Sequence, residues 1–167
     1  MSKQSSVSRS VLLAGIIVLI AQLAAAQAER TSKETTKTQF LNPAGLSKPM
    51  GYTQVVVAPP GKLIYVAGQV PLNASGEVVG KGDLRAQVTQ VMENLKTALA
   101  AAGATMKDVV KANYYVVNLK PEQVPIIREV RGKYFSAEHP PAGTLVGVTA
   151  LAQEGYMIEI EVVAALK

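Results

Sequence analysis

The sequence contains no cysteine and no tryptophan, and its only histidine is His139. Without cysteine the chain can form no disulfide, no thiolate metal site and no thiol nucleophile. One histidine also excludes a histidine-rich metal site, so we expect no bound metal. Because His139 precedes Pro140 and Pro141, it is predicted to lie in a loop. With no orienting partner nearby in the sequence, an exposed loop residue is favoured over a catalytic one.

Charge of either sign is sparse. The formal net charge is +5, and Lys3 and Arg9 near the start account for two of those positive charges. The other basic residues are scattered along the chain, without the patch or stripe that marks a nucleic-acid interface. We therefore expect no nucleic-acid partner.

Only one long apolar run is present, at residues 11–26, and it reads VLLAGIIVLIAQLAAA. A short basic start precedes it, and small residues at Ala26 and Ala28 follow, a combination typical of a secretory signal peptide. The run is shorter than the roughly 20 apolar residues that span a bilayer comfortably. We expect residues 1–28 to be cleaved and the protein to be exported, periplasmic or secreted, without later membrane contact; a retained anchor is the alternative.

Beyond this run, the sequence predicts a flexible leader at 29–50, which is polar and poor in pattern, and one domain at 51–167. Two short β-rich runs separated by PPGK predict a hairpin. The clearest helix begins at the N-cap Asp83 and stops at Gly103. The expected elements are strands at 53–58 and 63–67, a helix at 83–102, a strand at 108–119, a helix ending near Phe135, and strands at 143–149 and 157–165.

This ββαβαββ order predicts an α+β fold in which two helices pack on one face of a sheet. The segments QVVVA and IYVAG are apolar on both sides of the predicted strands. A sheet covered on one face only would leave part of that surface exposed, and apolar patches of that size usually mark an interface. We expect a homo-oligomer that associates through its sheets.

Three segments resemble the RidA/YjgF family of reactive-intermediate deaminases: YVAGQVPLNASGEVVG, AQVTQVMENLKTALAAAGATMKDVVK, and EHPPAGTLVGV with MIEIEVVA. The resemblance runs from about Tyr52 to Ala165. It implies a chorismate-mutase-like, RidA-type fold and a homotrimer with a central barrel and small-molecule clefts between subunits. It also implies hydrolysis of 2-imino or enamine acids to 2-keto acids and ammonia, without a cofactor.

One departure from the family affects the expected chemistry. The typical motif Pro-Ala-Arg, whose arginine holds the substrate carboxylate, reads Pro141-Ala142-Gly143 here. Truncating one partner of a desolvated charge pair costs about 2–5 kcal/mol. Ala67 also stands where many members have serine. We therefore expect weak or absent activity on small imino acids, and a different or larger ligand.

The resemblance supplies the candidate site. Glu159 matches the position thought to activate water, and a carboxylate in an apolar cleft could serve as a general base; since Glu159 and Glu161 alternate with apolar residues, a solvent-facing pair is the alternative. Arg128 falls near a ligand-contacting position, although a solvated helix arginine is favoured for it. The substrate-binding candidates are Tyr52, Ala67, Gly68, Gly143, Thr144 and Arg128.

Three functions remain open at this stage. The first is an exported RidA-like hydrolase with an altered substrate. The second is a non-catalytic trimer that binds a small carbonyl compound or acid in the same cleft, which the loss of arginine and serine at Gly143 and Ala67 favours. The third is a chaperone-like holdase that uses its apolar surface.

Overall fold

The computed structural model describes residues 19–25, 27 and 37–166. Residues 19–25 and 27 are helical, and no helix among the described residues is long and apolar enough to cross a membrane. Most of the predicted signal peptide lies outside the described residues, so cleavage and export stay predictions. Residues 38–167 form a compact unit of their own.

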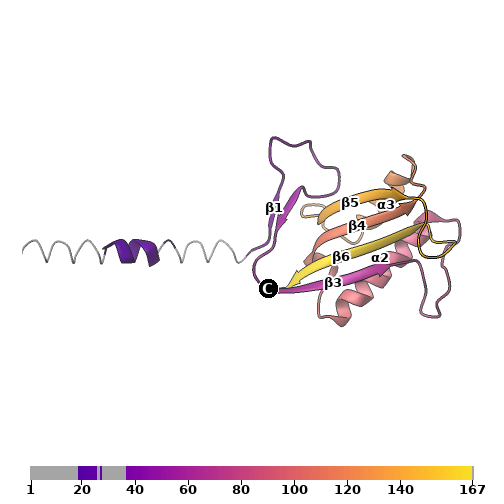
Figure 1. Ribbon diagram of the computed structural model, residues 1–167, viewed down its shortest axis with the longest axis horizontal. Coiled ribbons are helices and arrows are strands. Elements are labelled where there is room, and N and C mark those ends of the chain that lie inside the picture. The colour runs from indigo at the N-terminus through magenta and orange to yellow at the C-terminus, as the bar shows by residue number, and fades with distance from the viewer. Residues whose placement is uncertain (1–18, 26, 28–36, 167) are drawn as a thin grey trace, which may run out of the picture. The chain divides into compact units, whose positions relative to one another are not determined.

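The unit contains a four-stranded sheet with the strand order β3-β6-β4-β5 (Figure 1). The α+β fold that the sequence predicts is confirmed. Strand β6 pairs antiparallel with β3 and β4, and β5 pairs parallel with β4. The strands are β3 at Lys62–Gln69, β4 at Val109–Val117, β5 at Ala142–Val148 and β6 at Ile158–Leu166. Strands β3 and β5 therefore form the two edges.

The predicted hairpin between residues 53–58 and 63–67 is wrong. Strand β2, Val55–Val57, pairs instead with β1, Gln39–Leu41, in a separate two-stranded sheet. Strand β3 pairs instead with β6. Strand β1 lies within the segment for which the sequence predicts a leader.

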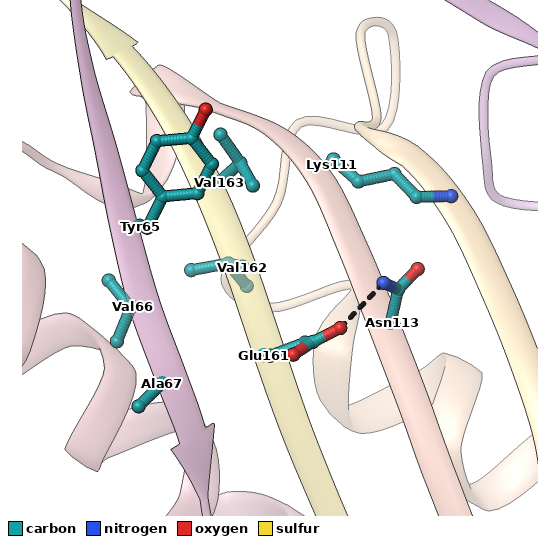
Figure 2. Close-up of a pocket in the computed structure, with 8 residues that line it drawn as sticks. All are labelled: Tyr65, Val66, Ala67, Lys111, Asn113, Glu161, Val162 and Val163. Atoms are coloured by element: carbon teal, nitrogen blue, oxygen red, sulfur yellow. Dashed lines mark hydrogen bonds between the residues drawn. The ribbon is translucent and has the colours of Figure 1, made fainter.

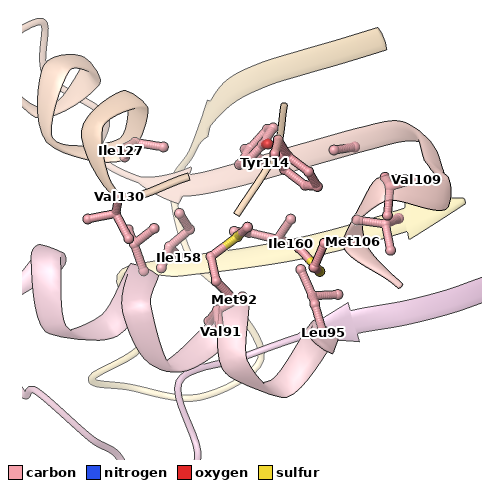
Figure 3. Packing of buried hydrophobic residues seen from close by; sticks show 14 of the residues in the cluster. Val91, Met92, Leu95, Met106, Val109, Tyr114, Ile127, Val130, Ile158 and Ile160 are labelled. Atoms are coloured by element: carbon pink, nitrogen blue, oxygen red, sulfur yellow. The ribbon is translucent and has the colours of Figure 1, made fainter. Parts of the chain in front are cut away.

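Helix α2, Leu84–Ala101, begins where the sequence predicts, since the side chain of Asp83 accepts a hydrogen bond from the Ala86 N–H at 3.1 Å. It ends before Gly103, whose φ of 76° suits glycine. Met92 and Leu95 pack against Ile158 and Ile160 of β6 in the core (Figure 3).

A short 3₁₀ turn, η1 at Met106–Asp108, leads into β4, and helix α3, Gln123–Arg131, packs beside α2. Buried and partly exposed residues alternate along β6 and, from Ala112 onward, along β4. The buried sides face the helices, and the other face of the sheet is left without a covering layer. Tyr65 is 74% exposed, and Leu63 and Val146 are also exposed. The sequence therefore predicted the uncovered apolar surface, while the homotrimer itself stays a prediction.

Candidate functional site

The start of β5 is held against the segment that carries Tyr52. The Thr53 N–H donates to the Pro141 carbonyl at 3.2 Å, and the Thr53 hydroxyl donates to the Pro140 carbonyl at 2.5 Å. These bonds bring Tyr52 beside Gly143. A Cβ atom added at Gly143 would lie 3.2 Å from the Cβ of Tyr52, which is tighter than most packed side chains allow. Glycine at this position thus permits the close approach of the two strands.

A cavity of about 320 Å³ opens at this edge of the sheet. Four predicted site residues, Tyr52, Arg128, Gly143 and Thr144, line it together. We call it the arginine cavity; its full lining is Met50, Tyr52, Val124, Arg128, Arg131, Gly143, Thr144 and Leu145.

Arg131 is the residue of this cavity that the sequence analysis missed. The sequence favoured a solvated helix face around Arg128, but the neighbouring Arg131 is buried, with only 8% of it exposed. The guanidinium lies over the Tyr114 ring, 5.2 Å from its centroid, in a cation–π contact. Spacing could have revealed it, since Arg131 follows the buried Ile127 by four residues and so shares its helix face.

The Arg131 guanidinium occupies space that Gly51 leaves open, and it lies beside Gly143. Its Nη1 lies 3.9 Å from where a Cβ at Gly143 would stand, and its Nη2 lies 2.9 Å from the corresponding position at Gly51. No carboxylate among residues 37–166 forms an ion pair with it. A buried cation is costly unless it is paired, so an anion from outside these residues would complete the site.

Tyr114 lies beneath this cation and is itself buried. Its hydroxyl has no hydrogen-bond partner among the described residues. Burial raises the pKa of the Tyr114 hydroxyl above its usual range, and the positive charge of Arg131 opposes that rise. The ring is thus a neutral, apolar support that positions the guanidinium.

The other three predicted residues lie elsewhere in the sheet. Ala67 and Gly68 belong to the edge strand β3, and Glu159 belongs to its neighbour β6. A Cβ atom at Gly68 would overlap Oε1 of Glu159, so only glycine leaves room for this carboxylate. We call Ala67, Gly68 and Glu159 the glutamate edge.

Glu161 lies next to the glutamate edge but has a different environment (Figure 2). Its Oε1 accepts hydrogen bonds from Asn113 Nδ2 at 2.8 Å and from the Tyr115 hydroxyl at 2.9 Å. These two bonds hold the pKa of Glu161 below its usual range. Glu161 and Ala67 line a second cavity, of about 390 Å³. In contrast, no side chain of the described residues is hydrogen-bonded to the Glu159 carboxylate.

The arginine cavity and the glutamate edge are separated within one chain. Gly143 and Thr144 lie on the edge strand β5, whereas Ala67 and Gly68 lie on the opposite edge strand β3. Strands β4 and β6 run between them. The chain therefore brings the predicted residues together as two groups and not as one site.

Neither group offers a metal site. No cluster of three or more His, Cys, Asp or Glu side chains that could hold a metal occurs in the described part of the chain. His139, which was predicted to be an exposed loop residue, is exposed and stacks on Phe40 with ring centroids 4.9 Å apart. Arg128 and Arg131 instead suit an anionic organic ligand.

Comparison with known proteins gives the same family from sequence and from fold. The profile of the family described as Endoribonuclease L-PSP matches residues 45–166. A RutC family protein of Pyrococcus horikoshii is 39% identical over 119 residues, covering 70% of this chain and 89% of that protein. A protein named 2-iminobutanoate/2-iminopropanoate deaminase, from Dermatophagoides farinae, is 31% identical, covering 72% of this chain and 90% of that protein.

Two crystal structures carry the same fold. A Rid family protein of unknown function from Yersinia pestis superposes with a TM-score of 0.72 at 41% identity, covering 77% of this chain and 98% of that chain. RidA from an Antarctic Psychrobacter species superposes with a TM-score of 0.57 at 29% identity, covering 77% of this chain and 99% of that one.

Proposed function

Since the chain belongs to the Endoribonuclease L-PSP family, which includes the RidA/YjgF proteins, we propose that it hydrolyses imines or enamines of small carboxylic acids. The products are the 2-keto acid and ammonia. The observation that supports the proposal is Arg131, whose buried guanidinium points into the space beside Gly143. A cation thus remains at the arginine cavity although the family's signature arginine is absent.

The reaction needs three things from the protein. The substrate carboxylate has to be held, for which the planar guanidinium fork of Arg131 is suited. A water molecule has to add to the C=N carbon, and Glu159 would accept a proton from it as the new C–O bond forms. Glu159 would return this proton to the nitrogen, which gives the amino alcohol; an enamine would first tautomerise to the imine. The hydroxyl proton then passes to the nitrogen as the C–N bond breaks, so that ammonia leaves and the C=O bond of the keto acid forms. No cofactor enters this sequence.

We propose that these groups meet between copies of the chain in a homotrimer. The arginine cavity lies at the β5 edge and the glutamate edge at the β3 side of the sheet. In a closed ring of identical subunits, each contact joins one surface to a different surface of the next copy. Such a ring would place the arginine cavity of one copy beside the glutamate edge of its neighbour, with the uncovered sheet faces directed inward.

The test is ammonia release from 2-iminobutyrate generated in situ. We expect wild-type protein to accelerate release above the buffer rate and Glu159→Gln to lower the turnover number by about 100-fold or more, the range of general base catalysis. Glu154→Gln, which removes an exposed carboxylate in a loop, is the matched control and should leave turnover unchanged. Equal rates for wild type and Glu159→Gln would contradict the proposal.

A non-catalytic binding protein is the second candidate. It is favoured by Ala67, which provides no hydroxyl beside Gly68. In that case keto acids would raise the melting temperature while no variant changes ammonia release.

The holdase would require the exposed apolar face of the sheet to protect a model client from aggregation. Export by the N-terminal segment likewise stays a proposal, and N-terminal sequencing of the mature protein tests it.

A further inference from the structure

We propose that the arginine cavity selects ligands with two carboxylates, such as a 2-imino or 2-keto dicarboxylic acid, over acids with one. The proposal rests on the binding site of the proposed function, but it does not require that the site catalyses hydrolysis. The reason is that the cavity contains two arginines, Arg128 and Arg131, and no carboxylate among its lining residues. One guanidinium suffices for a monocarboxylate, so the second needs an explanation.

Both arginines are on the same side of α3. They are three residues apart, which places them about 4.5 Å apart along the helix axis and on one face. Arg131 is almost completely buried and lies at the inner end, beside Gly143 and above Tyr114. Arg128 is half-buried and lines the same cavity. A ligand that reaches from one guanidinium to the other would therefore be held at both ends.

The carboxylate closest in sequence is not available to either arginine. Glu129 receives two hydrogen bonds from Arg85, at 2.6 and 2.8 Å, and lies 3.8 Å from Lys133 Nζ. Within the described part of the chain, no ion pair involves Arg128 or Arg131. The cavity thus keeps two positive charges that a dianion would neutralise together.

The rim of the cavity adds to the positive field. The Thr144 hydroxyl accepts a hydrogen bond from Lys111 Nζ at 2.9 Å, so a third cation lies beside the cavity. Tyr52 supplies a phenol whose hydroxyl can donate to a carboxylate. A volume of about 320 Å³ is at the lower end of the range for small-molecule sites.

The experiment measures binding by calorimetry with two non-reacting probes, 2-oxoglutarate with two carboxylates and 2-oxobutyrate with one. For the wild-type protein we expect 2-oxoglutarate to bind at least about 30-fold more tightly, as the loss of one partner of a charge pair would give. Arg128→Gln should weaken 2-oxoglutarate binding about 10-fold or more and change 2-oxobutyrate binding less than about 3-fold. Arg131→Met should weaken both.

Lys107→Gln removes one positive charge from an exposed side chain outside the cavity and is the matched control. It should leave both affinities unchanged. If Arg131→Met fails to fold, binding to Arg128→Gln and Arg131→Lys still tests the proposal. We expect both variants to fold, because Arg128 is only half-buried and because lysine preserves the positive charge of Arg131. Equal affinity for the two probes, or an equal effect of Arg128→Gln on both, would overturn the proposal even if ammonia release from 2-iminobutyrate is observed.

Discussion

The two sides of the sheet have charges of opposite sign. Arg128 and Arg131 of α3 lie beside the edge strand β5, and Glu159 of β6 lies beside the edge strand β3. At the β5 edge, two arginines share a cavity without a carboxylate. At the β3 side, Glu159 lies over Gly68, and no cation of the described residues pairs with it. Each group thus lacks a partner of opposite charge among the described residues. We propose that each group acts on a ligand or meets the opposite group of another copy.

A second contrast lies within β6 itself. Glu159 and Glu161 are two residues apart on the same face, yet only Glu161 is fixed by Asn113 and Tyr115. Hydrogen bonds that stabilise the charged form make Glu161 a poor base at neutral pH. Its neighbour is left to interact with water or substrate, which is why we assign the chemistry to Glu159.

The largest expected effect comes from removing the buried cation. Arg131→Met should reduce kcat/KM for 2-iminobutyrate by about 30-fold to several thousand-fold, because about 2–5 kcal/mol of charge-pair stabilisation is lost. Steady-state kinetics measures the change, and circular dichroism establishes that the variant is folded. Arg131→Lys should recover part of the loss. A variant with wild-type kinetics would show that Arg131 does not contact the substrate.

Gly68→Ala is expected to have a smaller effect, at the glutamate edge. The added methyl group would displace the Glu159 carboxylate, and misplacing a catalytic group by about 1 Å can cost about 100-fold in rate. We expect kcat to fall by about 10- to 100-fold with little change in thermal stability. Gly45→Ala, where an added Cβ meets nothing within 4 Å, is the control. Full activity in Gly68→Ala would separate Glu159 from catalysis.

Gly143→Arg restores the family's motif but should lower the free energy of unfolding. The new side chain would press on Tyr52 and place a third guanidinium in the cavity that Arg128 and Arg131 line. Overpacking of this kind costs about 1–3 kcal/mol, and the like charges add to it. In the Arg131→Met background the cost should be smaller, and a double-mutant cycle in urea gives the coupling between the two sites. Additive effects would mean that the two positions do not share space.

The smallest expected effect is that of Glu161 on how the free energy of unfolding depends on pH. Because its folded-state pKa is lowered, the charged form stabilises the fold at pH values above the ordinary carboxyl pKa of about 4.3. That stabilisation is lost as the pH falls through the lower folded-state pKa. Glu161→Gln should therefore lower the unfolding free energy near pH 7 by about 1 kcal/mol and flatten its decline in acid. Urea titrations at a fixed protein concentration across this range test it; an unchanged pH dependence would contradict the assignment.

The sequence predicts most of the fold because the signals are local. The apolar stripe of α2, the cap at Asp83 and the stop at Gly103 each depend on neighbouring residues alone. The hairpin failed for the opposite reason. Residues 55–57 pair with β1, and β3 pairs with the distant β6, and no short-range pattern reports either choice.

For the candidate site, too, the sequence predicted some of the residues and missed another. Family resemblance indicated Tyr52, Gly143, Thr144 and Arg128, and these residues share one cavity. Arg131 was not among the predicted residues, because charged residues usually lie on the surface. Its spacing from Ile127 indicated the buried side of the helix, but its contacts with Tyr114 and with the open space at Gly51 join distant parts of the chain. The cavity positions and the helix face of Arg131 were thus readable from the sequence, and the surroundings of its guanidinium were not.

The most direct test of the two-edge account mixes two inactive variants. Arg131→Met retains an intact glutamate edge, and Glu159→Gln retains an intact arginine cavity. If each site joins the two edges of neighbouring copies in a ring, co-refolding equal amounts should restore ammonia release to about a quarter of the wild-type rate, since one junction in four would combine both intact edges. Mixtures that stay as inactive as the separate variants would contradict the account.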